Sequence, residues 1–233
     1  MARRPRFAPA GYAQHVIQRG NNRQTIFCCD HDRALYTRWL RDYAEEYEVA
    51  IHAWVYMSNH VHLLVTPDQA DGLSLTMQAL GRRYVRYFNR KYERSGTLFE
   101  GRFRSCLVAD RGYLLACCRY IEMNPVRAGI VEFPEDYLWS SYGSNALGLK
   151  SSLISPHKSY LALGASQEQR QRAYRGLFVA REGDLSIEEI RLATNKGLAF
   201  GGARFKDEFE SIFACSVTPG PRGRPRLVEK KLL

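Results

Sequence analysis

Two strand-like runs around a two-residue polar turn constrain the fold of this chain more than any other feature. Residues 49–57 (VAIHAWVYM) and 60–66 (HVHLLVT) are rich in β-branched and aromatic residues, and only Ser58 and Asn59 separate them. Such runs joined by so short a turn predict a β-hairpin. Because a two-stranded hairpin is not stable alone in water, other strands or helices must cover it.

The segments on either side of the hairpin supply those partners. An amphipathic helix is predicted before it, since apolar residues recur every four positions from Leu35 to Tyr47, and another after it, from Leu73 to Phe88. Further strands are predicted at 12–18 and 104–109. The order strand, helix, strand, strand, helix, strand predicts an α+β fold, the ferredoxin-like split β-α-β antiparallel sheet. In that fold the first and third strands are central, so residues 60–66 lie mid-sheet.

The rest of the chain predicts an added helix and a distinct C-terminal part. A helix is expected over 110–124, ending at Pro125. We expect a main domain at 1–145, a small helical region of unknown role at 159–213, and a basic, disordered tail at 214–233 that is rich in proline, glycine and arginine.

The charge balance indicates a polyanionic partner. The chain has 34 Lys and Arg against 24 Asp and Glu, a formal net charge of +10. Nucleic acid is the commonest partner of such a surplus, although a membrane surface or an acidic protein would also be attracted. No run reaches the roughly 20 apolar residues of a membrane span, and the N-terminus lacks the apolar stretch of a secretory signal, so a cytoplasmic location without membrane partners is expected. The six cysteines show no CxxC spacing, which argues against a zinc ribbon.

The sequence His60-Val61-His62 is the sharpest local feature. Alternate residues of a strand share a face, so both imidazoles point the same way, about 7 Å apart, as a bidentate metal site requires. His-X-His also occurs by chance on half-exposed strands. In a central strand, however, two histidines are costly unless they have a partner.

The stretch YIEMNPV places Tyr120 and Asn124 one helical turn apart on a shared face. A phenol and an amide oxygen in that arrangement could serve as nucleophile and third metal ligand. The alternative is also open: the chain has 14 tyrosines, most of which must serve packing or surface roles, and asparagine is common at helix ends before proline.

Four stretches together resemble a known family. HVIQRGNNRQTIF, WVYMSNHVHLL, GTLFEGRFRS and YIEMNPVRAGIV occur in order between residues 12 and 145. They resemble the HUH-superfamily single-tyrosine transposases, and most closely the REP-associated tyrosine transposase (RAYT) branch. The resemblance implies a metal-dependent endonuclease and strand transferase that cleaves and rejoins single-stranded DNA at REP-like hairpins. It also implies Mg²⁺ or Mn²⁺ and a covalent 5′-phosphotyrosine intermediate.

Carried over by position, the resemblance makes His60 and His62 metal ligands and Tyr120 the nucleophile. Asn124 becomes the third ligand, where insertion-sequence relatives often have glutamine. Neutral imidazoles and an amide oxygen suit Mn²⁺ and tolerate Mg²⁺. The general base is not identified.

Basic residues interleaved with aromatics suit single-stranded DNA, because cations neutralise the backbone and rings stack on bases. Within the helix around Tyr84 the alternative is that the arginines form only its solvated side. The C-terminal tail resembles an AT-hook, an arginine clamp for the minor groove. The predicted DNA contacts lie in the loop after the first strand, in the second helix, near the fourth strand and in the tail: Arg19, Asn21, Asn22, Arg23, Arg83, Arg86, Arg90, Arg102, Arg104, Arg222, Arg224 and Arg226.

Two other functions remain open on the sequence alone. One is a binding module that uses the ferredoxin-like sheet without catalysis, although no aromatic RNP signature is present. The other is a replication or relaxation initiator of the same superfamily. For the transposase reading, the expected partner is single-stranded or hairpin DNA, and the chain is a monomer or homodimer, with a monomer acting in cis favoured.

Overall fold

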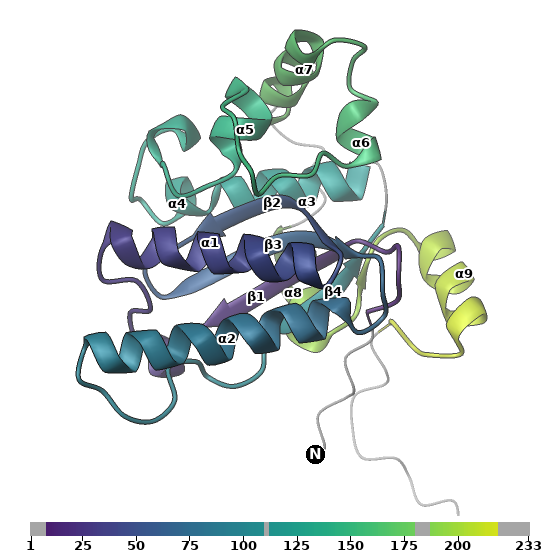
Figure 1. The fold of residues 1–233 in the computed structure, drawn as a ribbon. Helices are drawn as coiled ribbons and strands as arrows, with labels where there is room; N and C mark the ends of the chain where they lie inside the picture. Colours follow the sequence, from purple (N-terminus) through teal and green to yellow (C-terminus); the bar gives the residue numbers. More distant parts are fainter. Residues whose placement is uncertain (1–7, 110–111, 180–186, 219–233) are drawn as a thin grey trace, which may run out of the picture.

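The computed structural model describes residues 8–109, 112–179 and 187–218. Its centre is a five-stranded sheet in the order β2-β3-β1-β4-β5 (Figure 1). The strands are β1 (Gln14–Arg19), β2 (Val49–Tyr56), β3 (His60–Pro67), β4 (Arg104–Val108) and β5 (Ala199–Phe200). The first four pair antiparallel, with β3 and β1 in the middle, so the predicted α+β fold and its central strands are confirmed. β5 adds a short parallel strand beside β4.

One face of the sheet is covered by α1 (Asp30–Glu46) and α2 (Gly72–Lys91), which lie side by side (Figure 1). The fully buried Tyr36 of α1 and Tyr84 of α2 lie on the apolar helix faces that pack on the sheet. Side chains alternate along a strand, so Val61 and Leu63 of β3 point into this core while His62 points away from it. Burying each large apolar side chain contributes about 1.5–3 kcal/mol.

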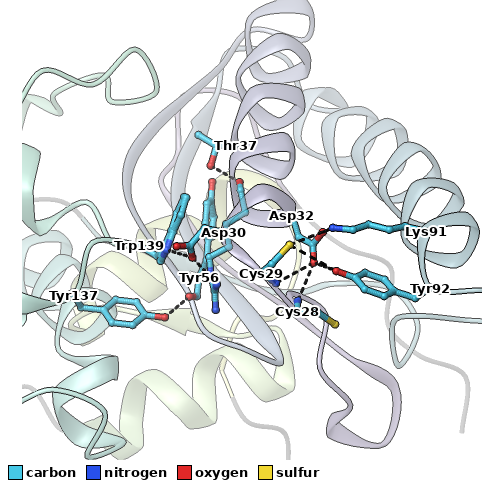
Figure 2. Close-up of polar contacts among 11 residues, drawn as sticks. Cys28, Cys29, Asp30, Asp32, Thr37, Tyr56, Lys91, Tyr92, Tyr137 and Trp139 are labelled. Carbon is cyan, nitrogen blue, oxygen red and sulfur yellow. Dashed lines mark hydrogen bonds and ion pairs between the residues drawn. The ribbon is translucent and has the colours of Figure 1, made fainter.

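A buried carboxylate joins the start of α1 to the end of α2. Figure 2 shows Asp32 accepting hydrogen bonds from the Cys28 amide (2.9 Å), the Tyr92 hydroxyl (2.7 Å) and the Lys91 ammonium (2.6 Å). Burial alone would raise the pKa of this carboxyl. The hydrogen bonds from Lys91 and Tyr92, together with one from Tyr87, instead hold its pKa well below the usual range. The charge of Lys91 is thus paired with Asp32 inside the fold.

The opposite face is covered by α3 (Gly112–Glu122) and α8 (Ile187–Lys196). Leu114 and Ile121 of α3 pack with Leu64 of β3 and with Ile190 of α8 in a second core. The expectation that one helix runs on to Pro125 was wrong. α3 ends at Glu122 and a short α4 (Asn124–Arg127) follows, with Pro125 in its first turn, where its missing N–H leaves no helical hydrogen bond unmade.

The remaining helices extend this second layer. α5 (Tyr142–Leu147), α6 (Lys158–Leu161) and α7 (Gln167–Val179) form a group next to α3 (Figure 1). α9 (Ala203–Phe213) packs near the N-terminal segment, where its Phe209 meets Tyr12 edge-on. Two 3-10 turns, η1 (Asn21–Arg23) and η2 (Pro134–Asp136), complete the described elements. No helix in the described ranges has the length and apolar character to cross a membrane.

Candidate active site

His60 and His62 lie side by side on the face of the sheet beneath α3. Their ring centroids are 5.0 Å apart. His62 is 2% exposed, whereas His60, at the start of β3, is only partly buried. The strand alternation expected from the sequence therefore brings both imidazoles to one face.

Both rings use Nδ1 for a protein hydrogen bond. The His60 Nδ1 donates to the Asn59 side-chain oxygen (2.6 Å), and the Asn59 amide nitrogen in turn donates to the Arg23 carbonyl (3.1 Å). The His62 Nδ1 lies 2.9 Å from Nε2 of His15. Nε2 of each ring is the nitrogen left for a ligand, and metal-binding histidines typically anchor their other nitrogen in this way.

Burial keeps these imidazoles neutral. It lowers the pKa of His60 to about 4, with a further contribution from Arg19. It lowers the pKa of His62 well below its usual value, with repulsion from His15 and His60 acting in the same direction. Since only the neutral ring binds a metal, both histidines are in the binding form at neutral pH.

Tyr120 of α3 lies against His62 and His15. Its ring centroid is 5.7 Å from that of His62 and 5.6 Å from that of His15, both edge-on. The guanidinium of Arg127 sits 4.5 Å from the centre of the tyrosine ring and also donates to the Tyr120 carbonyl. The structure thus joins a phenol, two imidazoles and a cation from four elements, β1, β3, α3 and α4.

Asn124 follows one turn later, at the start of α4. Its side-chain nitrogen donates to the carbonyls of Tyr120 and Ile121, each at 3.0 Å. The side-chain oxygen is therefore the atom left for a ligand. Among the described residues, no group of three or more His, Cys, Asp or Glu side chains is arranged to hold a metal ion. A metal at this histidine pair would need a ligand of another type, which an amide oxygen satisfies. The ligand role of Asn124 stays a prediction.

Arginines surround the same face. Arg19 stands opposite His60 in the pairing of β1 with β3, and Arg104 stands opposite Ile17 on the neighbouring strand pair. Arg104 is held by Glu100 (2.9 Å) and Asn195 (2.7 Å). Burial lowers the pKa of Arg127 to about 10, and the nearby charges of Arg191 and Arg119 add to this effect. Arg19, Arg127, Arg119 and Arg191 therefore bring positive charge to the site, while the charge of Arg104 is paired with Glu100.

The other predicted DNA contacts lie in η1, which meets Asn59 next to His60, beside β4, on α2 and in the tail. Asn21, Asn22 and Arg23 form η1, directly after β1, and Arg102 is exposed just before β4. Arg83, Arg86 and Arg90 are exposed on α2. Because α2 and α3 cover opposite faces of the sheet, the sheet separates these arginines from Tyr120. The guanidinium of Arg83 stacks over Trp39 at 4.7 Å. The tail residues Arg222, Arg224 and Arg226 lie outside the described residues.

Sequence reasoning missed three members of the site: His15, Arg127 and Thr194. His15 lies on the predicted first strand, two residues before Ile17, whose partner across the sheet is His62. Arg127 follows Asn124 by one turn of α4. Thr194 belongs to α8, in a region to which no function was given, and its contact with His15 spans 179 positions of the sequence.

Comparison with known proteins decides the family. The family model described as "Transposase IS200 like" matches residues 10–124, which include both histidines, Tyr120 and Asn124. The chain belongs to this family. The transposase is also 26% identical, over 136 residues, to a Haemophilus influenzae protein described as a REP-associated tyrosine transposase. That match covers 51% of this chain and 77% of the relative.

A solved structure of a REP-associated tyrosine transposase bound to a REP hairpin matches with a TM-score of 0.54 at 18% identity. It covers 67% of this transposase and 93% of that chain, and at this identity it shows a shared fold. The family model and the Haemophilus influenzae relative, together with this shared fold, confirm the resemblance to the REP-associated branch seen in the sequence.

Proposed function

We propose that this transposase cleaves and rejoins single-stranded DNA next to hairpins through a 5′-phosphotyrosine intermediate on Tyr120. His60, His62 and Asn124 would hold a divalent metal, Mg²⁺ or Mn²⁺. The observation that carries the proposal is that Tyr120 packs against His62, while the Nε2 atoms of His60 and His62 are left for a ligand.

The covalent step follows from these groups. The Tyr120 oxygen attacks the phosphorus, the bond to the 3′ oxygen breaks, and the 3′ oxygen takes up a proton as Tyr120 loses one. A bound metal would orient the phosphate and neutralise charge that develops in the transition state. Because the phosphate stays activated on the tyrosine, a 3′-hydroxyl can attack it in reverse. Cleavage and joining are thus the same chemistry in opposite directions.

Arg127 is placed to assist the nucleophile. The phenol oxygen gains negative charge as it loses its proton and attacks the phosphorus. The guanidinium 4.5 Å from the ring centre favours the developing negative charge on Tyr120. Its hydrogen bond to the Tyr120 carbonyl fixes the cation relative to the helix that carries the nucleophile.

The surrounding charge fits a nucleic-acid strand. Arg19 lies on the same face as the histidines, where it can pair with a DNA phosphate, and Arg104 lies on that face with its guanidinium held by Glu100 and Asn195. The solved relative is bound to a REP hairpin, and we extend that class of DNA to this chain. Because Tyr120 packs against His62 of its own chain, a cis active site needs no second copy, and a monomer acting in cis is part of the proposal.

The test is covalent capture. Wild-type protein, Tyr120→Phe and Tyr113→Phe are incubated with Mn²⁺ and a labelled pool of single-stranded oligonucleotides that contain a hairpin with randomised flanks. Tyr113 is the matched control, since it lies on α3 but packs against Phe200 (5.1 Å between ring centroids). We expect a denaturation-resistant protein–DNA band from wild type and Tyr113→Phe, lost with EDTA and absent from Tyr120→Phe. A band of undiminished intensity from Tyr120→Phe would contradict the proposal.

A further inference from the structure

A chain of buried hydrogen bonds connects α8 to His62. The Thr194 hydroxyl donates to the Ile190 carbonyl (2.7 Å), and its oxygen lies 2.8 Å from the His15 Nδ1. The His15 Nε2 lies 2.9 Å from the His62 Nδ1. Thr194, His15 and His62 are 1%, 0% and 2% exposed, so water does not compete for these contacts.

The number of protons available to Thr194, His15 and His62 fixes the direction of each hydrogen bond. A carbonyl oxygen only accepts, so the single Thr194 proton goes to Ile190 and the Thr194 oxygen must accept from the His15 Nδ1. A neutral imidazole carries one N–H. The His15 Nε2 is therefore an acceptor, and the His62 Nδ1 must donate to it.

Two other placements of the protons on Thr194 and His15 do not change this result. The Cys106 sulfur lies 3.2 Å from the Thr194 oxygen. If Thr194 donated to this sulfur instead, its only proton would still be unavailable to His15. A doubly protonated His15 would carry a fully buried charge between the neutral Thr194 and His62, which is costly.

We infer that His15 and Thr194 are positioning residues that hold His62 in the tautomer with its proton on Nδ1 and its lone pair on Nε2. The inference rests on the metal site proposed above, because Nε2 is the nitrogen that would bind the ion. α8, which lies beyond the part of the chain matched by the family model, thereby becomes part of the active site. His60 is set by a separate contact, through Asn59 to the Arg23 carbonyl.

The chain contains a matched control. His52 on β2 is also a buried histidine bonded to a threonine, with Nε2 2.8 Å from the Thr66 hydroxyl oxygen, and its Nδ1 lies 2.7 Å from the Ser155 carbonyl oxygen. Its two ring nitrogens are thus engaged away from His60 and His62. Thr66→Val removes the same hydroxyl as Thr194→Val, from a histidine outside the proposed site.

The first experiment needs no metal. Long-range ¹H–¹⁵N correlation spectra of the full metal-free chain, labelled at histidine nitrogens and assigned with His15→Phe and His62→Gln, report the tautomer of each ring. We expect the Nδ1–H form for both His15 and His62, a mixture of forms at His62 in Thr194→Val, and the wild-type pattern in Thr194→Ser. A His62 protonated at Nε2 in the wild type would overturn the inference.

The second experiment measures the Mn²⁺ dissociation constant by electron paramagnetic resonance without DNA. Loss of a partner that orients a ligating histidine typically weakens metal binding by about 10–100-fold. We expect a loss in that range for His15→Phe, a smaller loss for Thr194→Val, and wild-type affinity for Thr194→Ser and Thr66→Val. Unchanged affinity in both His15→Phe and Thr194→Val would overturn the positioning role.

The two measurements separate the inference from the proposed function. A wild type that binds no Mn²⁺ would contradict the metal site, while the tautomers in the metal-free protein still decide the hydrogen-bond chain. Thermal melting shows whether each variant folds. If His15→Phe does not fold, the comparison of Thr194→Val with Thr194→Ser carries both tests, because valine and threonine have nearly the same shape.

Discussion

Glu122 should make the stability of this protein depend on pH near neutrality. It lies at the end of α3 with 0% exposure, and it accepts hydrogen bonds from Ser141 (2.5 Å), Asn145 (2.8 Å) and Tyr174 (2.8 Å). All three partners are neutral. Burial raises the pKa of the carboxyl from 4.5 to about 7, and the hydrogen bonds offset only part of this rise.

The direction of the effect follows from that difference. The folded protein binds the proton more tightly than the unfolded chain, so Glu122 stabilises the fold fully below pH 4.5, and this contribution is lost as the pH rises through 7. A pKa difference of about 2.5, at roughly 1.4 kcal/mol per pH unit, corresponds to about 3 kcal/mol. Glu122→Gln keeps the shape and removes the titration.

Urea unfolding at intervals between pH 4.5 and 8 measures the effect. As the pH rises over this range, the unfolding free energy of the wild type should fall by up to about 3 kcal/mol relative to that of Glu122→Gln. Glu45→Gln, on the exposed face of α1, controls for the loss of one carboxylate. Parallel pH profiles for wild type and Glu122→Gln, or a wild type that gains relative stability as the pH rises, would refute the reasoning.

Three further predictions concern the site. Arg127→Ala should slow cleavage by about 5–30-fold, the equivalent of a cation–π contact of roughly 1–2 kcal/mol, with DNA affinity little changed; equal cleavage rates for the two proteins would contradict it. His62→Ala should abolish both Mn²⁺ binding and cleavage while gel-shift binding of hairpin DNA persists, and cleavage at the wild-type rate would count against a metal at this histidine. Arg19→Ala should weaken DNA binding and reduce the slope of log affinity against log salt by about 0.7, whereas Arg86→Ala should leave both nearly unchanged because α2 covers the opposite face; the reverse ranking would place the DNA on α2.

The central fold could be predicted because short-range patterns determine it. Alternation along the strand showed that His60 and His62 share a face, and the order of elements placed β3 in the middle of the sheet. Tyr120 could be placed over the histidines because the sheet had one face left uncovered.

Other parts could not be predicted because they depend on distant pairings. Nothing in the local sequence pairs His15 with Thr194, since their contact forms only after β5 and α8 return to the sheet. The periodicity of α2 identified its apolar side correctly. It could not show that Arg83, Arg86 and Arg90 would be separated from Tyr120 by the sheet, because that depends on which face each helix covers.

The central claim is that Tyr120 becomes covalently joined to DNA. Wild-type protein that has reacted with hairpin-bearing single-stranded DNA and Mn²⁺ can be digested with nuclease and protease, and the peptides examined by mass spectrometry. We predict that the residual nucleotide is attached through a phosphodiester to the peptide that contains Tyr120, at the Tyr120 oxygen. An adduct on another residue, such as Tyr113, or cleaved DNA without any protein adduct, would contradict the account.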